Sequence, residues 1–556
     1  MPKGNYFLHF SALLLLLAIE TALATKSTLL VLKNAETLPY VHAICSTTAS
    51  KYVLDAKRLG LPADCHMPSQ CQHVYSGACL SGGGLAGTFS PAELDLLINT
   101  CLPAGSVLYQ EDDAAVIKAE HQPGKEKPHY KKLHRRSLRQ ARPGSNFVQN
   151  SAINGDQLDL WSISQGHDIN LLKEKHQTLA APLWNLDRID QQYMPLDKTY
   201  SFGSFESPGV GQGVTIYVLD TGIMSNHQEF QTWSSFAVDN NTAAAAVSAT
   251  STTGNVTRTA STSRASCGRD FVNGSVNCED VDGHGSHVAG TAIGLQVGVA
   301  KGASVIAVKI LDDQGLGTVG STIAGLDYVA STHRKPAVVT LSLGVQRGHY
   351  SRAMEDAVRA LVEDHGVMVI AAAGNGATDS CQFSPGATPQ AFTVAASGFS
   401  SKYSSFINTK NNKDSNAHAI KAVENDEAEG VYSEGNQGKC VDLFAPGTDI
   451  YSICGGIRRC GYVSTTTYAY ASGTSMAVPH VAGAAAIFLE AHPEASPAEV
   501  KEALKGAAIE GAISPMVLRA DTANILLQVK GLSGNQGASA AVHAADGPSE
   551  PTIGKR

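Results

Sequence analysis

The chain has 556 residues, of which 43% are hydrophobic, and a formal net charge of −8 at pH 7. This length exceeds one ordinary domain and supplies ample apolar material for a large core. The acidic balance argues against a nucleic-acid partner.

The first 24 residues predict a signal peptide. Lys3 precedes an apolar run from Phe10 to Ile19, and Ala22-Leu23-Ala24 follows as a small-residue cleavage site. The run is too short to span a bilayer, and no later segment is long enough. A signal anchor is the competing interpretation. We expect a secreted protein without stable membrane insertion.

A small α+β domain is expected over residues 25–118. Strands are predicted at Lys26–Lys33 and Gly105–Asp113. Between them Ser90 and Pro91 mark a helix start, since serine is a preferred N-cap and proline a preferred first helical residue. An unrelated small domain is the alternative to the precursor role considered below.

Residues 119–180 form a connector. Eight basic residues lie from Lys125 through Arg142, against the single acid Glu126. A charge run of this kind is usually a solvated linker. In a precursor it is also a processing site, for this protein or another.

Apolar strands and helices alternate between residues 181 and 532. Strands are predicted at 301–311, 337–344 and 367–373, and helices at 320–332 and 352–364. This alternation predicts an α/β fold, a parallel sheet with helices on both faces.

Two polar insertions, 237–266 and 400–436, are expected to be surface loops, and the Gly/Ala-rich tail 533–556 to be disordered. Asn240, Asn255 and Asn273 each stand in an N-x-S/T triplet and are candidate glycosylation sites.

Three motifs carry the chemistry. A β-branched strand ends in Asp220-Thr221-Gly222, His284 stands between glycines before a small-residue helix, and Ser475 stands in a glycine-led turn before another. Carboxylates at strand tips and hydroxyls at helix starts are typical functional positions. We expect Pro479 to lie in the first turn of the last helix, where its missing N–H is harmless.

Each motif alone has a plainer interpretation. Ser475 could simply cap its helix, and Asp-Thr-Gly also occurs in aspartic proteases. His284 and His287 could suggest a metal site, but no third ligand stands at a recognisable spacing. We expect His287 and His480 to be structural, packed behind the site.

Taken together and in this order, the motifs resemble those of the subtilisin family of serine proteases, closest to the proteinase K branch, over roughly residues 180–530. The resemblance implies a subtilisin-like catalytic domain with Ser475 as nucleophile, His284 as base and Asp220 as the orienting acid. It also implies that residues 25–118 are an inhibitory propeptide, cut soon after Val116.

The resemblance extends to the substrate-binding residues. Asn375, in Gly374-Asn375-Gly376, would be the oxyanion donor, although a plain turn is the alternative. A Ser-Leu-Gly strand edge would pair with the substrate, and a second segment would line the primary pocket, which gives the set Ser342, Leu343, Gly344, Ala372, Ala373 and Gly374. Val345 replaces a common family glycine, and a broad or apolar preference is expected.

Eleven cysteines fit an oxidising compartment. The six in the catalytic part allow 15 pairings. We favour pairs close in sequence, namely Cys267–Cys278, Cys381–Cys440 and Cys454–Cys460. Five upstream cysteines leave one over, either free or linked to another chain.

The resemblance further implies a structural calcium ion held by the carbonyls of Pro389 and Ala391 and by Asp442. The sequence as a whole predicts a secreted, monomeric serine endopeptidase made as a zymogen, acting on polypeptides and inhibited by its own propeptide. The alternative is a binding protein on the same fold that cuts itself once and keeps its propeptide.

Overall fold

The structure is a computed structural model. It describes residues 25–120, 176–179, 183–202, 209–232, 263–345, 350–399, 429–515 and 517–533. The predicted signal peptide, the basic run of the connector, Asn240, Asn255, most of both insertions and nearly all of the tail lie outside the described residues.

An N-terminal unit is built on a four-stranded antiparallel sheet in the order β2-β3-β1-β4. Its elements are β1 (Lys26–Leu32), α2 (Leu38–Ile44), α3 (Ala49–Leu59), β2 (Cys71–Tyr75), β3 (Gly84–Phe89), α4 (Pro91–Leu96) and β4 (Val107–Asp112), with short helical turns at Ala35–Thr37, Ala63–Cys65 and Leu97–Cys101. Both predicted strands and the helix start are confirmed, since Ser90 and Glu93 cap α4 reciprocally.

Two disulfides, Cys45–Cys71 and Cys65–Cys101, cross-link this unit. The cysteine left over is Cys79, whose thiol is free and buried. Burial, followed by the nearby Asp327 carboxylate, raises the pKa of this thiol well above its ordinary value. It is therefore an unreactive thiol in the structure.

The main body contains a ten-stranded sheet in the order β20-β21-β17-β15-β14-β12-β8-β10-β9, with β16 beside β15. Its strands are β8 (Thr215–Asp220), β9 (Ala265–Asp270), β10 (Ser304–Lys309), β12 (Ala337–Leu341), β14 (Met368–Ala372), β15 (Phe392–Phe399), β16 (Glu429–Val431), β17 (Leu443–Pro446), β20 (Ile509–Glu510) and β21 (Ile525–Leu526). From β9 to β21 every pair along this path is parallel, and only β16 and β20 pair antiparallel.

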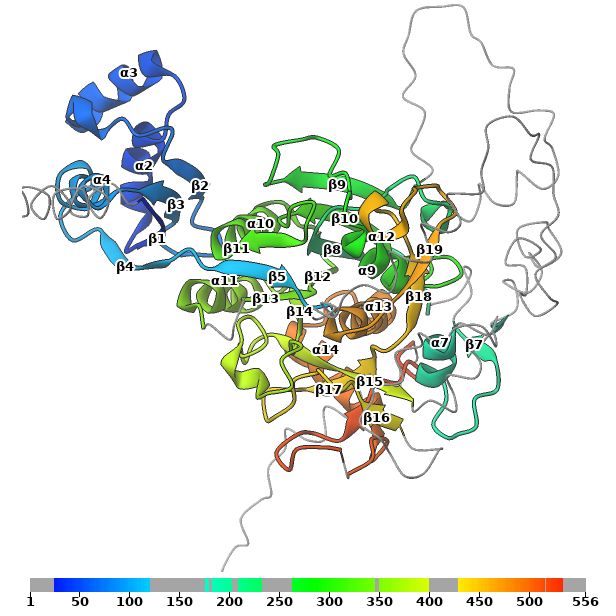
Figure 1. The fold of residues 1–556 in the computed structure, drawn as a ribbon. Coiled ribbons are helices and arrows are strands. Elements are labelled where there is room, and N and C mark those ends of the chain that lie inside the picture. The colour runs from blue at the N-terminus through cyan, green and yellow to red at the C-terminus, as the bar shows by residue number, and fades with distance from the viewer. Residues whose placement is uncertain are drawn as a thin grey trace, which may run out of the picture.

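Helices cover both faces of this sheet (Figure 1). One face packs against α9 (His284–Ile293), α13 (Thr474–Ala491) and α14 (Pro497–Ala507), and the other against α10 (Val319–Thr332) and α11 (Arg352–Glu363). Ile216 and Val218 of β8 point into the first core, and Tyr217 and Leu219 into the second. The predicted α/β architecture is confirmed.

The remaining short elements are α7 (Trp184–Ile189), α12 (Ile457–Cys460), the pair β18 (Ile450–Ile453) and β19 (Tyr468–Ala471), the pair β6 (His176–Thr178) and β7 (Thr199–Ser201), and turns at Gln228–Phe230 and Ser380–Gln382. All three predicted disulfides of the body are present, Cys267–Cys278, Cys381–Cys440 and Cys454–Cys460.

The expectation that no later segment could span a bilayer needs a correction. Within the described part of the chain, α13 is long and apolar enough to do so by length and composition. However, 89% of it is buried inside the protein. Its apolar character is explained by its place in the core, where all sides of the helix meet protein.

The N-terminal unit reaches into the body through β5 (Ala115–Lys118). This strand lies between β11 (Leu316–Thr318) and β13 (Leu343–Val345) and pairs antiparallel with both. Figure 1 shows β5 leaving the N-terminal unit and running along the body toward the start of α13.

Candidate active site

Asp220 and His284 form a buried pair. Asp220 is the last residue of β8, and His284 is the first residue of α9. The His284 ring donates from Nδ1 to Asp220 Oδ1 at 2.7 Å. This bond fixes the ring so that Nε2 is the free nitrogen, and Nε2 is buried without a partner among the described residues.

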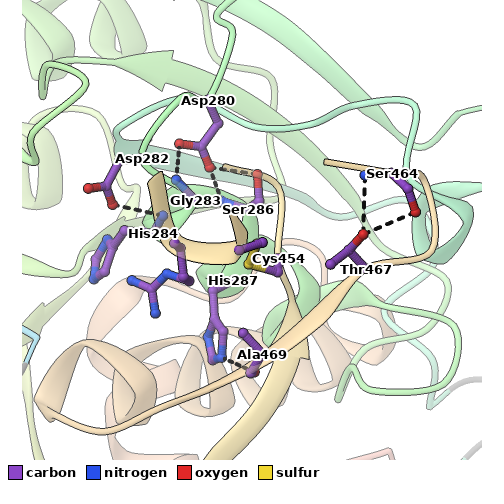
Figure 2. Close-up of a disulfide and its surroundings, with 12 residues drawn as sticks. Asp280, Asp282, Gly283, His284, Ser286, His287, Cys454, Ser464, Thr467 and Ala469 are labelled. Atoms are coloured by element: carbon purple, nitrogen blue, oxygen red, sulfur yellow. Dashed lines mark hydrogen bonds between the residues drawn. A yellow bond between two sulfur atoms is a disulfide. The ribbon is translucent and has the colours of Figure 1, made fainter. Parts of the chain in front are cut away.

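A second carboxylate, which the sequence analysis missed, holds the histidine turn in place. Asp280 accepts from the Thr221 hydroxyl at 2.8 Å and the Gly283 N–H at 2.7 Å, and its other oxygen accepts from the N–H and hydroxyl of Ser286 at 2.9 and 2.6 Å. Figure 2 shows the bonds from Gly283 and Ser286 to Asp280, beside His284. Asp280 thereby ties the end of β8 to the start of α9. Only a local excess of acids marks it in the sequence.

Ser475 lies in the first turn of α13. Gly473, with φ of 144°, precedes this helix, and the Ser475 N–H donates to the Ala119 carbonyl at 2.9 Å. The Ser475 hydroxyl donates to the Ser342 carbonyl at 2.9 Å, not to His284. Loose or misdirected hydrogen bonds of this kind are common in active sites before the reacting complex forms.

The placement of Pro479 in the first helical turn is wrong. Helix α13 begins at Thr474, so Pro479 stands inside it. Proline has no N–H for the carbonyl four residues earlier, which here is that of Ser475. The Ser342 hydroxyl donates to that carbonyl instead, at 3.1 Å. Because Pro479 leaves the Ser475 carbonyl without its helical donor, the Ser342 hydroxyl can bind this carbonyl.

Asn375 follows β14, and its side chain lies beside Gly473, near the Ala119 carbonyl that accepts from the Ser475 N–H. Its Oδ1 accepts from the N–H and hydroxyl of Thr474, each at 3.0 Å. These bonds leave Nδ2 buried without a partner in the described residues. A Cβ added to Gly473 would lie 2.7 Å from the Ala119 carbonyl oxygen and 2.9 Å from Asn375 Nδ2. The carbonyl and both N–H donors therefore lie around Gly473, where a side chain would not fit.

The Ser-Leu-Gly edge pairs with β5. Gly344 is opposite Ile117, and the Ala119 N–H donates to the Ser342 carbonyl at 3.0 Å. Val345 is opposite Val116, and both are buried in one apolar cluster. The Val345 side chain therefore packs against Val116, which is the fourth residue of this segment when Ala119 is counted as the first.

The predicted wall of the primary specificity pocket, Ala372 to Gly374, lies at the end of β14. Ala372 and Ala373 are buried, and Gly374 has a left-handed backbone with φ of 96°. Ala372 belongs to the same apolar cluster as Ala119.

His287 and His480 are fully buried, as expected for structural residues. His287 Nε2 lies 3.0 Å from the Ile450 carbonyl, and His480 Nδ1 lies 2.8 Å from the Met476 carbonyl. Across the described ranges no group of three His, Cys, Asp or Glu residues could hold a metal ion. Asn273, the one described glycosylation candidate, is exposed.

The predicted calcium ligands do converge, but on a lysine. Lys501 Nζ lies 3.4 Å from the Pro389 carbonyl, 3.2 Å from the Ala391 carbonyl and 2.9 Å from Asp442 Oδ1. The other Asp442 oxygen accepts from the Thr393 N–H at 2.9 Å. An ammonium group thus stands where the ion would, and these residues do not fit a calcium ion with Lys501 in place.

Comparison with known proteins identifies the family. The model of the subtilase family matches residues 211–539, more than half of the chain, so the chain belongs to the subtilase family. It is 37% identical over 321 residues to an extracellular serine proteinase of Thermus sp. (strain Rt41A), covering 58% of this chain and 60% of the relative.

Two further proteins are similar to this chain. The chain is 34% identical over 343 residues to alkaline serine exoprotease A of Vibrio alginolyticus, covering 61% of this chain and 49% of the relative. A cold adapted subtilisin-like serine proteinase of known crystal structure shares 33% identity with a TM-score of 0.46, covering 64% of this chain and 99% of that one. The chain spans about half to three fifths of the length of these two curated relatives.

Proposed function

We propose that this protein is a serine endopeptidase that hydrolyses peptide bonds through Ser475, His284 and Asp220. The observation that carries the proposal is the placement of a carbonyl of the chain, that of Ala119, against the Ser475 N–H and beside Asn375 Nδ2. A peptide carbonyl so held is ready for attack by the adjacent hydroxyl.

The catalytic steps follow from two side-chain nitrogens of the site that have no partner among the described residues, His284 Nε2 and Asn375 Nδ2. The Ser475 hydroxyl leaves the Ser342 carbonyl, passes its proton to His284 Nε2 and attacks the substrate carbonyl carbon. The Ser475 N–H and Asn375 Nδ2 stabilise the oxyanion, and Asp220 stabilises the charged imidazole. His284 then returns the proton to the leaving amine, and water releases the acyl group by the same steps in reverse.

The protein is made as a zymogen in this proposal, with the N-terminal unit as its inhibitor and the Ala119–Glu120 bond as the bond cut. Three sets of contacts support it. Asp113 accepts from the Gly320 N–H at the start of α10, Glu111 accepts from the Ser351 hydroxyl at the start of α11, and Asp327 accepts from three N–H groups of the N-terminal unit. Carboxylates at helix starts are favourable for both charge and hydrogen bonding.

Secretion is part of the proposal. Two similar proteins carry the words extracellular or exoprotease in their names, and five disulfides suit an oxidising compartment. The Lys501 ammonium takes the structural role that the resemblance assigns to calcium, because it neutralises Asp442 and donates to the carbonyls of Pro389 and Ala391.

The test compares secreted wild-type protein with Ser475→Ala, by intact mass, N-terminal sequencing and hydrolysis of casein. We expect the wild type to yield a chain starting at Glu120, or further on after trimming, and to digest casein, and the mutant to do neither. A wild type that cuts itself once, keeps the fragment and leaves casein intact would instead be a binding protein. Identical behaviour of the two would refute the Ser475 mechanism.

A further inference from the structure

Opposite charges flank the Ala119–Glu120 bond. Before it, the Lys118 ammonium lies 2.6 and 2.7 Å from the two carboxylate oxygens of Asp282. After it, the Glu120 carboxylate accepts from the Arg459 guanidinium at 2.5 Å. Asp282 and Arg459 belong to the body, so each charge of the bound segment meets its opposite across the interface.

Asp282 is part of the histidine turn. The His284 N–H donates to its Oδ1 at 3.2 Å, and Figure 2 shows the two residues side by side. The Lys118 stem passes over Gly315, where an added Cβ would lie 2.7 Å from Lys118 Cδ. The site thus has room for a long side chain and a carboxylate at its end.

The segment that carries Arg459 packs against the same turn. It lies in α12, which the Cys454–Cys460 disulfide closes into a loop. The Arg458 N–H donates to the Val281 carbonyl, and a Cβ on Gly283 would lie 2.9 Å from the Gly456 nitrogen. Figure 2 shows Cys454 near the start of α9. The backbone that carries Arg459 is therefore fastened to the histidine turn by contacts within the body.

The four charged side chains are largely shielded from solvent, which strengthens the interactions between them. The side chains of Lys118, Asp282, Glu120 and Arg459 are between 6 and 14% exposed. Burial by itself would raise the pKa of Glu120, but Arg459, His284 and Lys118 hold it well below its usual range. A neutral or like-charged side chain in either place would leave a buried charge unpaired, which is costly.

We propose that Asp282 and Arg459 set the sequence preference of the enzyme, selecting a lysine or arginine as the second residue before the cleaved bond and a glutamate or aspartate as the first residue after it. Between these two positions, the residue whose carbonyl is attacked is small, as Ala119 is. This inference rests on the proposed function and names the substrate class of that same site.

The test uses the mature enzyme and quenched fluorescent peptides with the sequence of residues 115–123. One peptide replaces the lysine by glutamine, one the glutamate by glutamine, and one reverses the glutamate to lysine. We expect kcat/KM to fall on the order of ten- to a hundredfold for each neutral replacement, because the charge-assisted bonds of that side chain are lost while the opposite charge on the enzyme stays buried.

Enzyme variants assign each preference to its residue. In Asp282→Asn, which keeps an oxygen for the His284 N–H, the lysine-to-glutamine ratio of kcat/KM should fall toward one. In Arg459→Glu, the preference after the cut should invert toward lysine. Exposed neighbours of the same charge, Glu279→Gln and Arg458→Gln, are the matched controls and should keep the wild-type ratios.

Ratios of kcat/KM are compared within one enzyme, so a general loss of activity does not move them. Ratios within twofold of one for the wild type, or unchanged ratios in Asp282→Asn and Arg459→Glu, would overturn the inference while leaving the protease assignment intact. A wild type that cleaves neither these peptides nor casein would instead remove the proposed function, and this inference with it.

Discussion

Removal of the Asp327 carboxylate should release the N-terminal unit from the body. This side chain, on α10, accepts from the N–H groups of Ser76, Ala78 and Cys79 at 2.8, 3.0 and 3.2 Å. Hydrogen bonds to a charged acceptor contribute about 1.5–3 kcal/mol each, and bonds that share one acceptor add less than their sum. We therefore expect Asp327→Ala to weaken retention by about 3–4 kcal/mol, or roughly 100- to 1,000-fold.

The assay follows the self-cut protein. Size-exclusion chromatography measures how much N-terminal fragment stays with the body, and the lag before casein hydrolysis measures its release. The variant should lose the fragment on dilution and shorten the lag. The control is Asp364→Ala, because Asp364 is an exposed carboxylate that adds negative charge near Cys79 but accepts no hydrogen bond from the fragment's backbone among the described residues. Equal retention in wild type and Asp327→Ala would refute this account of the interface.

Three further predictions concern single side chains. Asn375→Ala should lower kcat about 10²–10³-fold in peptide kinetics and, because Thr474 loses the acceptor of two hydrogen bonds, should also lower the melting temperature in calorimetry; an unchanged kcat would exclude Asn375 as an oxyanion donor. Lys501→Ala should lower the melting temperature and make it rise with added calcium, since the oxygens around Lys501 lose their cation; equal calcium responses in variant and wild type would count against the lysine's role. Burial lowers the pKa of His480 to about 4, so the unfolded state, with a pKa near 6.5, binds more protons between these values and stability falls as pH drops through that window. The free energy of unfolding in urea should fall by about 2 kcal/mol from this group between pH 7.5 and 5, and His480→Gln should lose that part of the pH dependence.

Local patterns were sufficient for the fold and for the elements that bear the site. The strand ending at Asp220 and the helices beginning at His284 and near Ser475 were all predicted, because side-chain periodicity and glycine turns report on the nearby backbone. The pairing Cys454–Cys460 was also predictable, since residues six apart in a turn have few other partners. The error at Pro479 arose where a distant group, the Ser342 hydroxyl, takes over a helix hydrogen bond.

Contacts between remote segments were decided by the tertiary structure alone. Lys118 and Asp282 are 164 positions apart, and nothing near either one indicates the other. Carbonyl ligands such as those of Pro389 and Ala391 leave no trace in the sequence. The sequence therefore does not indicate that Lys501 of α14 takes the place of the expected ion. Side-chain identity reports the local backbone, whereas the pairing of buried charges depends on which surfaces the packed sheet and helices bring together.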